Sequence, residues 1–106
     1  MKEKLQIHED TNWEKLNDTG TIQGRILNGV ATIIFKRVSL AGKAGANVQV
    51  VKLPEKYKTK YDISFPMFVN ASSSQVCVAW NYNSGSIYCY IPKETGTYNG
   101  VLSYPI

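Results

Sequence analysis

An Asn-Gly pair between two apolar stretches constrains the fold of this chain more than any other feature of its sequence. Asn28 and Gly29 separate residues 21–27 from residues 30–35, and both stretches are rich in β-branched side chains. A two-residue type I′ turn requires positive φ at both central positions, which asparagine and glycine tolerate better than other residues. The pattern therefore predicts an antiparallel β-hairpin over residues 21–35.

A second hairpin is predicted from residues 75–82 and 86–91, which flank a turn containing Gly85. A glycine suits the left-handed position of a three-residue hairpin loop. This register sets Trp80 opposite Tyr88 and makes Cys77 and Cys89 diagonal neighbours, a separation longer than a disulfide prefers. We therefore expect both cysteines to be free thiols, buried on one face of the sheet.

The two faces of this second hairpin are both apolar or aromatic. The first face carries Val76, Val78, Trp80, Tyr82, Tyr88 and Tyr90, and the second carries Cys77, Ala79, Asn81, Ile87, Cys89 and Ile91. A sandwich buries only one face of each sheet, so the aromatic face needs a neighbouring chain, another element of this chain, or a ligand to cover it. Aromatic rings offer apolar platforms to the C–H faces of sugars, so Trp80, Tyr82, Tyr88 and Tyr90 are candidate saccharide-binding residues. Packing in the core or at a subunit interface is the alternative.

Short strands with frequent turns continue along the rest of the chain. Residues 39–47 read as a loop, residues 48–53 as a strand ended by Pro54, and residues 62–69 as a strand at an edge or bulge because of Pro66. Residues 97–104 form either a last strand or a short Asn-Gly hairpin with a tail. About seven strands in 106 residues predict an all-β fold, an antiparallel sandwich or small barrel.

Residues 1–18 differ in pattern from residues 19–106. Thr11 and Glu14 have the spacing of a helix capping box, which predicts one or two helical turns through Leu16. We therefore divide the chain into a lead-in segment, residues 1–18, which is helical or the end of a stalk, and a β head domain, residues 19–106.

Charge is distributed unevenly between these two parts. Residues 1–18 carry three lysines and five carboxylates, whereas the remainder carries nine basic and three acidic residues. A basic module favours an anionic partner such as a wall polymer or a nucleic acid. Lys56, Lys58 and Lys60 interleave with Tyr57 and Tyr61, a combination that can hold single-stranded nucleic acid. A solvated connecting loop is the plainer interpretation of the same residues.

The residues needed for catalysis or metal binding are sparse. His8 is the only histidine, and only Glu55, Asp62 and Glu94 are acidic after residue 18, each at a turn or strand end. Neither a nucleophile–histidine–acid set nor a carboxylate pair for glycoside hydrolysis can be assembled from them. We expect no enzyme activity, no metal and no cofactor. The first residues lack the apolar core of a signal peptide, and no apolar run is long enough to span a membrane, so we expect no membrane insertion.

Residues 18–106 resemble the C-terminal head domains of tail-fibre or receptor-binding proteins of phages and prophages of Gram-positive hosts. The matching pieces include a loop and strand over residues 42–53 leading into a Leu-Pro-x-x-Tyr corner at Leu53 and Tyr57, and a hairpin turn containing Ser84 and Gly85. Residues 18–20 (Asp-Thr-Gly) before the first strand and residues 103–106 (Ser-Tyr-Pro-Ile) at the end also match. The family often continues the corner as Tyr-Arg-Pro, where this chain has Thr59 in place of the proline.

The resemblance implies a homotrimeric β head at the tip of a fibre that recognises glycans of the host cell wall without catalysis. It also implies an upstream tail or baseplate protein as a partner, and a place in the virion tail after synthesis in the bacterial cytoplasm. Two alternatives stay open: a small basic β-barrel that binds single-stranded nucleic acid, and a purely structural tail or baseplate component.

Overall fold

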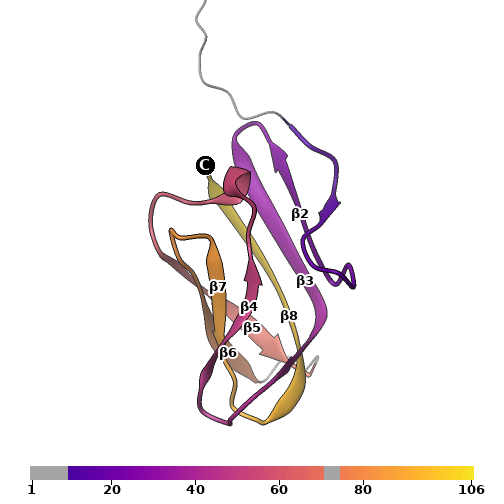
Figure 1. Ribbon diagram of the computed structural model, residues 1–106, viewed down its shortest axis with the longest axis vertical. Coiled ribbons are helices and arrows are strands. Elements are labelled where there is room, and N and C mark those ends of the chain that lie inside the picture. Colours follow the sequence, from indigo (N-terminus) through magenta and orange to yellow (C-terminus); the bar gives the residue numbers. More distant parts are fainter. Residues whose placement is uncertain (1–9, 71–74) are drawn as a thin grey trace, which may run out of the picture.

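A computed structural model describes residues 10–70 and 75–106, and these residues form one antiparallel sheet of eight strands (Figure 1). The strands are β1 (Glu14–Lys15), β2 (Ile22–Leu27), β3 (Val30–Ala41), β4 (Asn47–Lys52), β5 (Ile63–Val69), β6 (Val76–Asn81), β7 (Ser86–Tyr90) and β8 (Thr95–Pro105). One 3₁₀ turn, η1 (Glu55–Tyr57), connects β4 to β5. Their order in the sheet is β1-β2-β3-β8-β5-β6-β7-β4.

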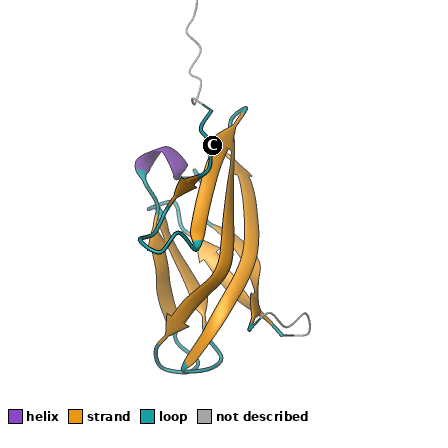
Figure 2. Ribbon diagram, turned by 90° about the vertical axis from the view of Figure 1, so that its right-hand side faces the viewer, coloured by secondary structure: helices purple, strands orange, loops and turns teal. Residues whose placement is uncertain are grey.

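The sheet curls on itself, so that two groups of strands face each other across a common core (Figure 2). Inward-facing side chains alternate along most strands, for instance Ile22 and Ile26 in β2 and Met67 and Val69 in β5. The described core also includes Phe35, Tyr57, Ile87, Cys89, Ile91, Tyr98, Leu102 and Tyr104. The predicted all-β antiparallel fold is confirmed.

The hairpin at Asn28 and Gly29 is confirmed, with φ values of 53° and 77° at these two residues. Its second strand is longer than predicted, because β3 continues to Ala41. The expected loop over residues 39–47 is therefore wrong for residues 39–41, which pair with β8. A bulge between Phe35 and Val38, with Arg37 at φ 52°, shifts the pairing register between β3 and β8. β3 pairs with β8 on both sides of this bulge.

The second hairpin has the predicted register and the predicted faces. Trp80 pairs with Tyr88, and the face that carries both cysteines is the one turned to the core. Cys77 and Cys89 are free thiols, buried, with their sulfur atoms 3.5 Å apart. Gly85 has φ 95°, as its turn position requires.

Pro66 lies where β5 has a partner on only one side. β5 pairs with β6 along its length but with β8 only at Phe68 and Val69. Val69 donates its N–H to the carbonyl of Gln75, on the β6 side of the strand. Successive peptide groups of a strand point to alternate edges, so the nitrogen of Pro66 points away from β6. On that edge no hydrogen bond to a neighbouring strand is required of it. β8 is a single strand, so no hairpin forms at Asn99 and Gly100.

The predicted helical turns at residues 11–16 are wrong. Thr11 donates its N–H to the carbonyl of Ile26 (2.8 Å) and accepts the N–H of Ile26 on its side-chain oxygen (3.0 Å), while β1 pairs with β2. The capping signal is local, and pairing with the free edge of β2 offers the same backbone more partners. The division of the chain at residue 18 stays a prediction, and residues 1–9 of the lead-in lie outside the described residues.

Candidate functional site

The four candidate saccharide-binding aromatics lie on the outer face of the β6–β7 hairpin. The hairpin register fixes this side, since Cys77, Ala79 and Asn81 alternate with them and point into the core. Trp80, Tyr82 and Tyr88 are half-buried, and Tyr90 is 41% exposed. The four aromatics are therefore outside the core of this chain, and that part of the packing alternative is wrong.

The four rings divide into two pairs. Trp80 and Tyr90 line an open groove of about 390 Å³ together with Gln75, Val76, Val78 and Pro92. Tyr82 and Tyr88 pack against each other edge to face, with ring centroids 5.8 Å apart. The groove thus has two aromatic walls and few polar groups, which is the composition of a platform for an apolar face of a ligand.

The apolar outer face extends beyond the hairpin onto the neighbouring strand. Phe68 in β5 pairs with Val76 in β6, and Pro66 pairs with Val78. Val76 and Val78 are 51% and 45% exposed, and Phe68 is exposed as well. Contiguous exposed apolar side chains of this kind often mark an interaction surface, whereas single exposed apolar residues are common on any protein.

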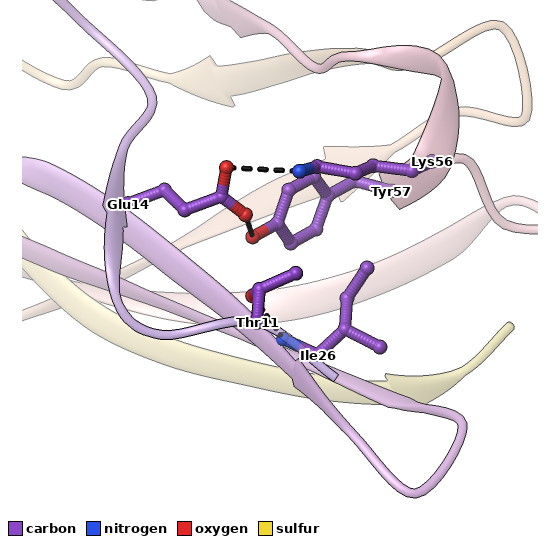
Figure 3. A network of polar contacts seen from close by, with 5 residues as sticks. All are labelled: Thr11, Glu14, Ile26, Lys56 and Tyr57. Carbon is purple, nitrogen blue, oxygen red and sulfur yellow. Dashed lines mark hydrogen bonds and ion pairs between the residues drawn. The ribbon is translucent and has the colours of Figure 1, made fainter. Parts of the chain in front are cut away.

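The basic and aromatic stretch after β4 is occupied by internal contacts. Lys56 pairs with Glu14 (2.9 Å), and Lys58 pairs with Glu55 (2.9 Å). Tyr57 is fully buried, with its hydroxyl donating to Glu14 (2.8 Å), as Figure 3 shows. The ring of Tyr57 is therefore closed to a stacking base, and only Lys60 and the strongly exposed Tyr61 face solvent without an ion pair among the described residues.

This network ties together three segments that are distant in sequence, and Figure 3 shows the contacts of Glu14 with Lys56 and Tyr57. Glu14 comes from β1, Lys56 and Tyr57 come from η1, and the carbonyl of Tyr57 accepts a hydrogen bond from Tyr104 in β8 (2.6 Å). The hydrogen bond from Lys56 lowers the pKa of Glu14. Burial, with the neighbouring Glu14, raises the pKa of Tyr57 to about 12. The corner that carries the Leu-Pro-x-x-Tyr motif is thus a structural element.

Other buried groups also prefer their neutral forms. Burial raises the pKa of Tyr98 and of Tyr104 to about 12, and it raises the pKa of both cysteine thiols. Thiols in this state are poor nucleophiles. Within residues 10–70 and 75–106, no cluster of histidine, cysteine and acidic residues could hold a metal ion. The described residues also include no helix long and apolar enough to cross a membrane.

Sequence reasoning missed a polar groove of about 420 Å³ between β3 and β4. Its lining comes from three segments: Asn17, Thr19 and Thr21; Arg37, Val38, Ser39, Leu40 and Ala41; and Val48, Gln49 and Val50. The turn and strand segments are each unremarkable in sequence. Only the curl of the sheet brings them together, so no local signal could have located this groove.

The fold is that of a phage head domain. The described structure matches the crystal structure of the head domain of phage bIL170, reported among the receptor binding domains of lactococcal phages, with a TM-score of 0.69 and 19% sequence identity. The match covers 90% of this chain and 97% of that domain. No protein-family model matches the sequence, and no curated protein matches it either.

Proposed function

We propose that this chain is the non-catalytic head of a phage receptor-binding protein, which attaches the virion tail to a saccharide on the host cell surface. The observation that carries the proposal is the likeness in fold to a lactococcal phage head domain over nearly the whole of both chains. Fold alone does not fix function. The aromatic groove on the outer face supplies the second argument, because it is a surface that the chain's own core does not use.

The saccharide site in this proposal is the groove at Trp80 and Tyr90. Stacking on these rings covers an apolar sugar face, and the half-buried Tyr88 lies opposite Trp80 in the hairpin. Each groove offers few polar contacts, so a single site binds weakly. Several sites on one particle gain avidity on a repetitive cell wall.

A homotrimer supplies those several sites and covers the remaining apolar surface. Pro66 and Phe68, which are exposed on β5 and do not line the groove, form the proposed subunit interface beside it. The stoichiometry of three, the attachment to an upstream tail or baseplate protein and the location in the virion tail are implied by the resemblance to phage heads. A purely structural tail component is the competing function for the same assembly.

Binding to purified cell-wall polysaccharide of candidate host bacteria tests the saccharide site. Trp80→Ala should weaken binding about two- to twelvefold, because one stacked ring contributes about 0.5–1.5 kcal/mol. Tyr61→Ala is the matched control, since Tyr61 is an exposed aromatic outside the groove. Equal losses in both variants, or no binding of the unaltered protein to any wall glycan, contradict the saccharide site and favour the structural component.

Light scattering tests the interface separately. Phe68→Glu places a charge in the apolar surface and should convert a trimer to monomers at micromolar concentration. Val30→Glu, at a similarly exposed valine in β3 outside the proposed interface, should leave the mass unchanged. An unaltered protein that is monomeric at all concentrations rules out this assembly.

A further inference from the structure

A seam in the sheet separates β3 from β4, although the two strands follow each other in sequence. Figure 1 shows them joined at the lower end and diverging from there. β3 lies between β2 and β8 in the sheet, whereas β4 ends the order of the described strands and has β7 as its one partner among them. The groove of about 420 Å³ lies between the two strands. Among the described residues, the seam is thus bounded by two strand edges that do not pair with each other.

The edge of β3 at the seam carries peptide groups that pair with no other strand of residues 10–70 and 75–106. β2 pairs with β3 only as far as Phe35, and Thr21 accepts the N–H of Lys36 just beyond. Gly42 donates to Glu94 on the β8 side, so two-residue alternation turns the peptide groups of Ser39 and Ala41 toward the seam.

The edge of β4 has the same property. Ile91 donates its N–H to the carbonyl of Ala46, and Val48 pairs with Cys89. Alternation then turns the peptide groups of Asn47 and Gln49 away from β7 and toward the seam. A bulge between Gln49 and Val51 ends the regular ladder there, which limits the free edge to a short length.

The side chains that line the seam alternate in character. Val38 and Leu40 are buried, and Val48 and Val50 are only partly buried at the margin of the core. Arg37, Ser39 and Gln49 are exposed, and Arg37 is the one charged residue among those lining the groove. A strand placed in the seam would therefore meet apolar side chains on its inner face and a cation with hydrogen-bonding groups on its outer face.

We propose that the seam between β3 and β4 binds an extended segment of another polypeptide by strand addition, and that this segment alternates apolar with acidic residues. Main-chain hydrogen bonds to Ser39, Ala41 and Gln49 would hold the added strand, its apolar side chains would cover Val48 and Val50, and an acidic side chain would pair with Arg37. Strand addition is a common mode of peptide recognition. An exposed strand edge that binds no specific partner promotes unspecific pairing with other chains and aggregation.

The test uses the full chain and a capped pentapeptide of alternating valine and glutamate. Amide resonances and hydrogen-exchange rates report on Ser39, Ala41 and Gln49 during the titration. These amides should shift and become protected while those of the β6–β7 hairpin do not. The same peptide N-methylated at its valines keeps its side chains but loses the backbone N–H donors along one edge of the strand. It should bind at least about tenfold more weakly.

Substitutions at the bulge test the charge complementarity. Arg37→Asn removes the cation at a backbone φ of 52° that asparagine tolerates, and should weaken the glutamate peptide about threefold. Arg37→Lys keeps the charge and should bind within about twofold of the unaltered chain.

Three results overturn the proposal. They are an absence of shifts at the seam amides at millimolar peptide, equal binding of a valine–lysine peptide, and concentration-dependent shifts of the seam without any peptide. The last result would mean that a second copy of this chain occupies the seam.

Discussion

Two groups of aromatic residues in this chain have similar composition and opposite fates. Tyr57, Tyr98 and Tyr104 are fully or almost fully buried, and two of them join a network that reaches Glu14 at the surface. Trp80, Tyr88 and Tyr90 lie on the outer face of β6 and β7. The interior group holds distant segments together, whereas the outer group is only partly covered by its own chain. The difference shows that an aromatic residue is available for binding only when the fold leaves part of its ring exposed.

The largest expected effect of this difference is a loss of stability at alkaline pH. The pKa values of Tyr57, Tyr98 and Tyr104 are raised to about 12 from the ordinary value of 10.0. Between pH 10.0 and 12 the native state therefore keeps protons that the unfolded state loses. The stability that the neutral buried tyrosines contribute is fully present below pH 10.0 and disappears as the pH rises toward 12. Chemical denaturation at a series of pH values, with tyrosinate absorbance recorded in parallel, should show unfolding coupled to this titration. A native fold with all tyrosines ionised contradicts the buried positions.

A pair of alanine substitutions compares the two groups directly. Tyr57→Ala should lower the free energy of unfolding by about 3–5 kcal/mol, because it removes a buried ring and leaves a cavity. Tyr90→Ala should lower it by about 1 kcal/mol or less, since the ring is half exposed. Urea denaturation measures both values. Equal losses would mean that the outer face belongs to the stabilised core, and would undermine the saccharide site.

A smaller effect is expected at the surface end of the interior network. Glu14→Gln should cost about 1 kcal/mol, because the amide keeps the volume but weakens the hydrogen bonds from Tyr57 and Lys56, and the ion pair is partly exposed to solvent. The pKa of Glu14 is lowered in the folded state, so its contribution is present above the ordinary value of 4.5 and is lost as the pH falls through the folded value. The difference in stability between the two proteins should therefore shrink in acid. A constant difference from neutral to acidic pH would show that the carboxylate charge plays no part.

Much of the fold could be predicted from turn chemistry and alternation. Asn28 and Gly29 located the first hairpin because few other residue pairs tolerate their φ values, and Gly85 fixed the register that places Trp80 opposite Tyr88. The alternation of cysteine, alanine and asparagine with aromatic residues distinguished the two faces. Because the side-chain period of a strand is two, a correct register assigns every residue of the hairpin to a side at once.

The capping signal at Thr11 and Glu14 gave a wrong prediction because a contact with a distant segment outweighs this local preference. A capping box stabilises a helix end by roughly 1 kcal/mol, which pairing with a free strand edge outweighs. Glu14 then serves as the acceptor for Tyr57, a residue that lies far from it in sequence. The nucleic-acid interpretation of residues 56–61 depended on the same kind of local pattern, and the contacts of Lys56 and Tyr57 inside the molecule could not be read from that pattern.

The sequence by itself determined the class of fold, the two hairpins and the division of the second hairpin into two faces, since these depend on φ preferences and on the two-residue period of a strand. Only the tertiary structure decided which face the curled sheet encloses, which tyrosines are buried, and where β3 and β4 leave a seam. These properties depend on strand order and on contacts between segments distant in sequence, and strand order is set by the sum of many weak packing terms that no short motif records.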